Sequence, residues 1–279
     1  MASLNAFAPI IWTSKLFVRL RANLVHAATV NRDYEGEIRG AGDRVVIVEL
    51  DPVATSTYTK NSDITFSDSG SYEKELLIDQ SLYYARNLDA IDRVQSKVNV
   101  LNAIVDEAGY GLAKDVDTDI ATLYSEAGNS VTAATVSEGS VLQNISNMQY
   151  ELDNANVPVG NRYFPIHPWY HRDLVQAATG IVGATSVPKL REDGALLNGY
   201  VGHLFGFDLL MSTQAAGGGT TTSYNMAYHR SAITFASQLS DFKVVDREKR
   251  NGIGIKCFLY YGRKVVRPEA MVSCTVTAG

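Results

Sequence analysis

The sequence predicts an α+β fold with an extended shape. Three observations support this class: a β-branched strand pattern before residue 76, the strongest helical periodicity of the chain at about residues 92–126, and strand patterns through most of the chain after residue 199. A helix of about thirty residues would span ~45 Å at 1.5 Å per residue, which suits a flat, extended molecule better than a compact one.

Composition limits the classes of function. The chain has 279 residues, of which 46% are hydrophobic and 20% are charged, as in ordinary globular proteins. Its net charge of −5 argues against a dedicated nucleic-acid-binding protein with a basic surface. Cys257 and Cys274 match neither a zinc spacing nor a disulfide framework, which favours a reducing compartment. No stretch approaches the ~20 apolar residues of a membrane span, so no membrane partner is expected.

Residues 1–32 form a basic N-terminal arm. They contain four basic residues and no acidic residue. Residues 13–28 predict a short amphipathic helix, because Leu16, Leu20 and Leu24 recur at a spacing of four. Basic amphipathic helices can lie on membranes, but the modest apolar face favours packing against a partner subunit.

A strand-rich hairpin follows the arm. Residues 44–50 are a β-branched run after the turn signal Gly40–Asp43, and a second strand is expected near residues 64–66. The polar stretch 55–63 has no core of its own to bury, so the hairpin needs a surface to lie on. Residues 73–84 predict a strand that returns from the hairpin.

The long helix begins near Asp92 and is expected to be the backbone of the molecule. Gly109 and Gly111 interrupt its pattern, and each costs ~1 kcal/mol relative to alanine. Its apolar residues recur at spacings of three and four. They are Val94, Val98, Leu101, Val105, Ala108, Leu112, Val116, Ile120 and Leu123.

The rest of the chain mixes helices and strands, without an internal repeat. The expected elements are a helix from residue 137, a short buried strand followed by a turn at 162–168, a helix at 169–178, a strand-turn-strand unit at 199–211, and strands at 226–236 and 242–276, the last with a turn at 250–252.

Acidic residues near the end of the long helix match part of a calcium loop. Those at loop positions 1, 3, 5 and 12 are Asp115, Asp117, Asp119 and Glu126. Position 6 requires a glycine, whereas this chain has Ile120. An acidic, solvent-exposed helix face is therefore the preferred interpretation.

No metal, cofactor or catalytic site is predicted. His167 and His171 are four residues apart, but Pro168 makes a shared helical face unfavourable and no third ligand is evident. The sequence has neither a G-x-S-x-G elbow nor a phosphate-binding loop.

Charge alternates in sign between large segments. Residues 1–32 carry +4, residues 33–92 carry −8, and residues 243–268 carry +6. A single charged run is usually a solvated face. Alternation on this scale indicates segments that meet each other, either within the chain or between copies.

The order of these parts resembles the major capsid proteins of tailed double-stranded DNA bacteriophages, which have the HK97-like fold. The likeness covers nearly the whole chain and depends on the order and spacing of several short motifs. These are Tyr34–Ile38 with Gly42–Val45, Leu77–Gln80 through Leu88–Asp92, Pro168–Tyr170, Gly206–Asp208, His229–Ile233 and Arg263–Ala270.

The resemblance implies an HK97-like capsid fold with four parts. They are an N-terminal arm at 1–32, an extended loop (E-loop) at 33–75, a peripheral (P) domain at 76–137 and 243–279 with a spine helix at about 92–126, and an axial (A) domain at 138–242. The implied function is a shell protein that self-assembles into hexamers and pentamers of an icosahedral or prolate head around double-stranded DNA. Its expected location is the virion, after assembly in the host cytoplasm.

Further partners follow from the resemblance. They are a portal protein, a decoration protein, and packaged DNA bound without sequence specificity. The E-loop begins near residue 33, so a separate scaffolding protein, or none, is expected instead of a long fused one. The alternative function is an encapsulin-type nanocompartment shell, which shares the fold but packages a protein cargo. An enzyme with an unrecognised site in residues 138–242 is a second alternative.

Two surfaces are candidates for these contacts. Lys15, Arg19 and Arg21 are expected to face the lumen of the shell and to meet scaffold or DNA phosphates. The acidic hairpin is expected to lie across a basic surface of a neighbouring subunit.

That second contact has candidate residues on both sides. Glu73 and Glu75 represent the hairpin. Lys249 and Arg250 represent the basic surface of the neighbour. Lys60, the only lysine of the hairpin before Glu73, is the candidate for the lysine–asparagine crosslink that some relatives form.

Overall fold

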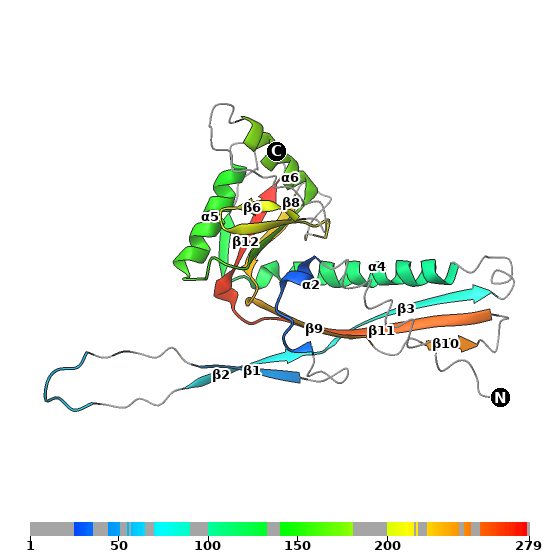
Figure 1. Ribbon diagram of the computed structural model, residues 1–279, viewed down its shortest axis with the longest axis horizontal. Coiled ribbons are helices and arrows are strands. Elements are labelled where there is room, and N and C mark those ends of the chain that lie inside the picture. Colours follow the sequence, from blue (N-terminus) through cyan, green and yellow to red (C-terminus); the bar gives the residue numbers. More distant parts are fainter. Residues whose placement is uncertain are drawn as a thin grey trace.

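The computed structural model describes residues 25–35, 44–50, 55, 57–64, 70–89, 100–132, 140–180, 200–214, 216, 222–239, 243–246 and 252–277. Figure 1 shows a long helix above a twisted layer of strands, with a narrow hairpin that reaches out to one side. A second sheet, with helices packed beside it, forms a thicker body above this layer (Figure 1). The molecule is therefore extended, as the sequence predicts.

The hairpin consists of two antiparallel strands, β1 (Arg44–Leu50) and β2 (Ser71–Leu77). Val45 and Leu76 lie opposite each other and are buried together with Ile78 and Ala236. The first predicted strand is confirmed, but its partner is residues 71–77 and not residues near 64–66. Ile64 is exposed and outside any strand, because the polar stretch before it offers no apolar side chain for pairing. Residues 65–66 lie outside the described part of the chain.

A four-stranded sheet forms the layer beneath the long helix. Its strands are β3 (Gln80–Asp89), β9 (Ile233–Leu239), β10 (Lys243–Asp246) and β11 (Gly252–Val265). β11 pairs antiparallel with β3 on one side and with β9 and β10 on the other. Successive side chains of β11 point to opposite faces, so Cys257, Leu259 and Tyr261 are buried on the helix side while Lys256 is exposed on the other.

The long helix is α4 (Val100–Ala121), and a 3₁₀ turn, η3 (Thr122–Glu126), continues it. Residues 92–99 of the predicted helix lie outside the described residues, and the last five predicted helical residues belong to η3. Gly109 and Gly111 do not interrupt α4. The predicted apolar stripe is confirmed where side chains are described. Ala108, Leu112, Val116, Ile120 and Leu123 are all buried.

The thicker body contains a six-stranded sheet in the order β4-β12-β8-β5-β7-β6. The strands are β4 (Asn129–Thr132), β5 (Arg162–Ile166), β6 (Tyr200–Leu204), β7 (Phe207–Met211), β8 (Thr222–His229) and β12 (Met271–Thr277). α5 (Val141–Asn154) packs on β12 and on α6 (Pro168–Gly180). Neither these helices nor the others described are both long and apolar enough to cross a membrane.

The two sheets divide the chain differently from the predicted domain boundaries. β12 lies in the segment assigned to the P domain, yet it pairs with β8 and β4 of the six-stranded sheet. β9 lies in the segment assigned to the A domain, yet it pairs with β11. The chain passes between the sheets at residues 230–232 and again through η4 (Pro268–Ala270). Buried strands read alike in sequence, so their pattern does not indicate which sheet they join.

Candidate inter-subunit surfaces and the arm junction

A short helix, α2 (His26–Thr29), attaches the N-terminal arm to the rest of the protein. The backbone N–H of His26 donates to Asp117 Oδ1 of α4 at 2.6 Å. The hydroxyl groups of Thr29 and Tyr228 lie 2.7 Å apart, which links α2 to β8. Asn31 exchanges two backbone hydrogen bonds of 3.0 and 2.9 Å with β9. Residues 26–31 therefore connect the long helix to both sheets.

The imidazole of His26 is buried at this junction. Neither ring nitrogen has a hydrogen-bond partner among the described residues, and Nε2 lies 3.9 Å from Asp117 Oδ2. Burial lowers the pKa of His26, and the nearby Asp117 carboxylate opposes this effect only in part. The imidazole is therefore neutral at pH 7, although it lies beside a buried carboxylate.

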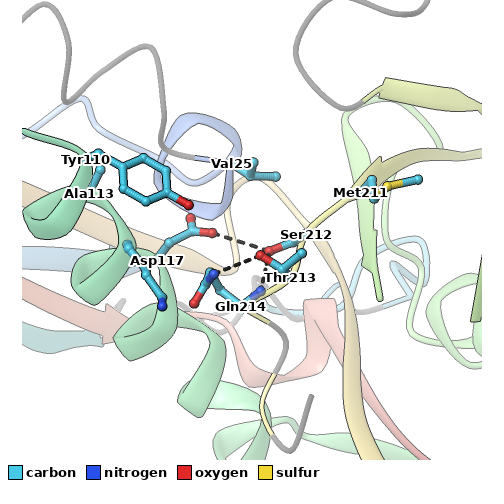
Figure 2. A pocket seen from close by; sticks show the side chains of 9 residues that line it. Val25, Tyr110, Ala113, Asp117, Met211, Ser212, Thr213 and Gln214 are labelled. Carbon is cyan, nitrogen blue, oxygen red and sulfur yellow. Dashed lines mark hydrogen bonds between the residues drawn. The ribbon is translucent and has the colours of Figure 1, made fainter. Parts of the chain in front are cut away.

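A pocket of about 230 Å³ opens beside the same junction (Figure 2). Its lining comes from the residue before α2, from one face of α4, and from the end of β7 with the segment that follows it. In Figure 2, dashed lines join Asp117 to Ser212 and Ser212 to Gln214, whereas the Met211 side chain points away from them. The lining residues are Val25, Tyr110, Ala113, Lys114, Asp117, Met211, Ser212, Thr213 and Gln214.

The polar groups of the pocket do not form a nucleophilic triad. Ser212 Oγ donates to Asp117 Oδ2 at 3.4 Å, and the imidazole of His26 approaches the same carboxylate. A serine nucleophile needs the imidazole next to its hydroxyl group, with the carboxylate behind. Here the carboxylate stands between the other two groups. The arrangement therefore fixes the junction and does not activate Ser212.

The acids of the partial calcium loop have separate structural roles. Asp115 is exposed, as predicted, but the solvent-face interpretation is wrong for Asp117, which is 3% exposed. Asp119 accepts hydrogen bonds from Arg263 and Tyr261 of β11. Asp117 directly follows Val116, which belongs to the apolar stripe. This position on the buried side of the helix is the signal in the sequence that could have predicted the burial of Asp117.

No metal-binding cluster of three or more His, Cys, Asp or Glu side chains occurs among the residues whose placement is described. His167 follows β5 and His171 lies in α6, and the backbone N–H of His171 donates to the His167 carbonyl at 3.1 Å. Burial lowers the pKa of His167. The backbones of these two histidines therefore form the first turn at the N-terminal end of α6.

One face of the hairpin is directed away from the body of the protein, and we call it the hairpin outer face. It carries Arg44, Val46, Val48, Glu73, Glu75 and Leu77, which the β1–β2 register places on the same side. Val48 is 59% exposed. Arg44 Nη1 lies 3.4 Å from Glu75 Oε1. This face therefore combines exposed apolar groups with acidic ones.

The opposite face of the hairpin is held by its own chain. Lys74 Nζ donates to Glu49 Oε2 at 3.3 Å and also to the carbonyl of Val266. Arg267 Nε lies 3.3 Å from Glu49 Oε1. One acid of the −8 segment is thus paired with one base of the +6 segment inside a single chain. Pairing of Glu73 and Glu75 with a neighbour stays a prediction.

The four-stranded sheet carries aromatic and basic side chains on the side opposite α4, and we call this the sheet open face. Tyr83 is exposed there, whereas Phe258 and Tyr260 are half-buried. Tyr83 is 70% exposed and its ring centroid lies 6.0 Å from that of Phe258. The Phe258 and Tyr260 rings are stacked at 6.4 Å. Lys243 and Lys256 are exposed and lie opposite each other in the β10–β11 register.

Of the remaining candidate residues, only one lies in the described part of the chain. Lys60 is exposed in a turn of the hairpin, in which the Ser62 N–H donates to the Thr59 carbonyl at 3.0 Å. Lys249 and Arg250 lie outside the described residues, as do the three basic residues of the arm. Those arm residues are Lys15, Arg19 and Arg21.

This architecture matches known shell proteins. A protein-family model described as phage capsid protein matches residues 87–274, which is more than half of the chain. The chain belongs to this phage capsid protein family. It is accordingly a structural protein of a bacteriophage capsid, and the resemblance seen in the sequence is confirmed.

Solved structures agree with this family. A chain from a structure titled Mycobacterium phage Che8 is 25% identical, with a TM-score of 0.73 and 90% of each chain covered. A chain from the capsid of cyanophage P-SCSP1u is 15% identical, with a TM-score of 0.70 over 93% of this chain and 90% of that one. The virus-like particle from Pyrococcus furiosus is 13% identical, with a TM-score of 0.60 over 96% and 99%. A search of curated protein sequences finds no significant match.

These likenesses establish the fold of the phage capsid protein as HK97-like and α+β, which confirms the predicted class. α4 is the spine helix of that fold. Capsid proteins of this kind self-assemble into shells, and the location of this chain is accordingly the virion.

Proposed function

We propose that this chain is the major capsid protein of a tailed phage, assembling as hexamers and pentamers into an icosahedral or prolate head around double-stranded DNA. The observation that carries this proposal is the pair of complementary exposed faces on one extended chain. The hairpin outer face is apolar and acidic, and the sheet open face is aromatic and basic. A closed shell is the arrangement in which every copy offers both faces to its neighbours.

In the proposed contact, the hairpin outer face of one subunit lies across the sheet open face of the next. Val46 and Val48 would cover the aromatic rings of Tyr83 and Phe258, which burial removes from water. Glu73 would lie among the basic side chains around the rings. An exposed charge pair contributes only ~0–1 kcal/mol, so the apolar contact supplies most of the affinity and the charges favour the correct partner.

The basic arm supports the packaging part of the proposal. Lys15, Arg19 and Arg21 have no acidic residue near them in sequence, and in the lumen they would contact phosphates without sequence specificity. A portal protein, a separate scaffolding protein and a decoration protein complete the proposed set of partners. Assembly would take place in the host cytoplasm.

An encapsulin-type shell is the second candidate. The observation in its favour is the likeness to the virus-like particle from Pyrococcus furiosus, which covers 96% of this chain. The two functions require the same assembly and differ in what the shell encloses. Double-stranded DNA is the expected content for the first, and a protein cargo for the second.

Electron microscopy of the purified protein tests the shared part of the proposal. We expect closed shells built from hexamers and pentamers. The contents of shells from their native source then separate the two candidates: nuclease-protected double-stranded DNA supports the phage head, whereas a stoichiometric second protein without DNA supports the nanocompartment. Protein that stays monomeric at every concentration and in every salt condition would overturn both.

A further inference from the structure

The turn between β6 and β7 holds a phenylalanine in an unfavourable backbone conformation. Phe205 has a φ of 49° and Gly206 a φ of 79°, while Leu204 and Phe207 on either side form a strand pair. Two-residue turns with positive φ at both central positions favour asparagine or aspartate followed by glycine. The glycine is present here, but the first position is a large aromatic residue, whose Cβ disfavours this conformation.

This phenylalanine differs from the other described residues with positive φ that are not glycine. Those residues are Asn61, Asn156 and Asn161. Asparagine tolerates the left-handed region because its short polar side chain bonds locally, an advantage that phenylalanine lacks. Phe205 is also 38% exposed. The single chain therefore carries both backbone strain and a partly exposed aromatic side chain at one position.

Val159 lies beside this turn. A Cβ built at Gly206 would be 3.3 Å from Val159 Cγ1, so the turn and the Val159 loop are in contact. Val159 is 61% exposed. We call Phe205 and Val159 the apolar knob. It lies on the body that contains the six-stranded sheet, with one residue on the turn from β6 to β7 and the other on the loop between α5 and β5.

The loop that presents Val159 is held from beneath by a buried arginine. Arg162 is 1% exposed; its Nε donates to the Pro158 carbonyl at 2.8 Å and its Nη2 to the Val157 carbonyl. Arg162 Nη1 also lies 2.7 Å from Asp153 Oδ1 at the end of α5. A loop fixed in this way loses little conformational freedom when it is bound, which favours affinity.

We infer that the apolar knob is a contact with a second copy of this chain. The inference rests on the proposed function, in which each subunit is surrounded by other copies. Backbone strain and solvent exposure both disfavour Phe205 in the isolated subunit. Both are explained if the ring is held in position to fill a site on a neighbouring subunit. Aromatic side chains on rigid supports commonly dominate the energy of interfaces between subunits.

The decisive variant is Phe205→Asn, because the inference predicts opposite effects on two measurements. Asparagine relieves the backbone strain, so the unfolding midpoint of the unassembled subunit should rise. Loss of the ring should raise the subunit concentration needed for shell assembly by about tenfold or more. Asn156→Gly is the matched control, because Asn156 is exposed, polar and of positive φ on the same loop as Val159. It should leave assembly unchanged.

Val159→Ser provides a second test that does not depend on strain. This variant should weaken assembly without raising the unfolding midpoint, and it decides the matter if Phe205→Asn does not fold. A lower midpoint with normal assembly in Phe205→Asn would show that the ring packs within its own chain, and the inference would be overturned. If the parent protein forms no shells under any condition, the proposed function fails first, which is a separate result.

Discussion

Asp119 on the spine helix and Arg263 on β11 meet through two hydrogen bonds. Arg263 Nη2 donates to Asp119 Oδ1 at 2.6 Å, and Nε donates to Oδ2. The Tyr261 hydroxyl donates to the same Oδ2 at 2.9 Å. Burial raises the pKa of Tyr261, and the negative charge of Asp119 raises it further. One carboxylate near the end of α4 therefore anchors the helix to the sheet beneath it.

Breaking this anchor should destabilise the subunit. We expect Asp119→Ala to lower the free energy of unfolding by about 1.5–3 kcal/mol, as for other hydrogen bonds to charged groups. Arg263→Lys should lose most of the same energy, because a lysine ammonium group cannot form both parallel bonds. Urea denaturation of the unassembled subunit measures the effect.

The hairpin provides a matched control for this experiment. Arg44 and Glu75 form an ion pair whose side chains are 66% and 52% exposed. Removing it by Glu75→Gln should change the free energy of unfolding by less than ~1 kcal/mol, because solvent screens such a pair. Equal losses in Glu75→Gln and Asp119→Ala would contradict the assignment of a special role to Asp119.

Substitution by alanine should change the free energy of unfolding in opposite directions at two glycines. A Cβ at Gly262 would lie 2.3 Å from the Leu77 carbonyl oxygen and 2.8 Å from Ile78 Cδ1, where the hairpin meets the sheet. Gly262→Ala should therefore lower the free energy of unfolding by about 1–3 kcal/mol through overpacking. At Gly111 of α4 a Cβ would meet no atom within 4 Å, so Gly111→Ala should raise stability by up to ~1 kcal/mol.

Thermal unfolding of the two variants, with hydrogen exchange of the hairpin amides, checks this prediction. Faster exchange in β1 and β2 should accompany Gly262→Ala, because its backbone contact is with the base of the hairpin. A neutral Gly262→Ala would show that Leu77 and Ile78 move aside easily and that the hairpin base is not closely packed.

The sequence predicts those features that depend on residues near one another in the chain. The apolar stripe through Leu112 and Ile120 follows from local periodicity, and the short buried strand within residues 162–168 follows from local composition; both are confirmed. The roles of Asp117 and Asp119 were not predicted, because their partners lie far away in sequence, in α2 and β11. The sheet to which β12 belongs depends on pairing with residues that precede it by more than forty positions.

The candidate contact surfaces likewise combine features that the sequence shows directly with features that depend on contacts between distant residues. The acidic character of the hairpin and the basic character of residues 243–268 are properties of composition, so the sequence indicates them directly. The pairing of Glu49 with Arg267 inside one chain depends on where the hairpin base lies against β11, and periodicity carries no information about it. The strain at Phe205 depends on a backbone angle, which becomes visible only in the folded turn.

The stability of the unassembled subunit should decrease as the pH falls below about 6.5. Burial lowers the pKa of His26 in the folded state, so the unfolded chain binds a proton first as the solution becomes more acidic. His167 and His229 act in the same direction, since burial lowers the pKa of each. The free energy of unfolding should therefore be largest above pH 6.5 and fall by up to about 1.4 kcal/mol per pH unit for the buried His26, and by less for the two partly buried histidines.

His26→Leu isolates the contribution of the arm junction. The variant keeps the backbone hydrogen bond to Asp117 and removes the titrating ring, so its stability should change less between pH 7 and pH 5 than that of the parent. Urea midpoints across this range measure the slope, and the values at pH 8 serve as the reference at which His26 is neutral. An unchanged slope would assign the acid sensitivity to other groups.

Charge reversal at Glu73 tests the hairpin contact between subunits. Glu73 lies on the hairpin outer face, and Glu73→Lys should raise the subunit concentration needed for assembly at low salt. Compensating reversal at Lys249 and Arg250 should restore assembly if these residues face the hairpin of a neighbour. Asp79→Lys, at an exposed position just beyond β2, is the control and should assemble as the parent does.

Salt distinguishes the contribution of charge from that of apolar burial at this contact. The Debye length falls from ~10 Å at 0.1 M to ~3 Å at 1 M salt, so a contact dominated by Glu73 should weaken over this range in the parent and show no such dependence in Glu73→Lys. A contact dominated by Val48 and the Tyr83 ring should instead strengthen in sulfate or phosphate salts, which favour apolar burial. If Glu73→Lys assembles as well as the parent at low salt, charge does not hold the two faces together, and the hairpin is retained by its backbone and apolar contacts.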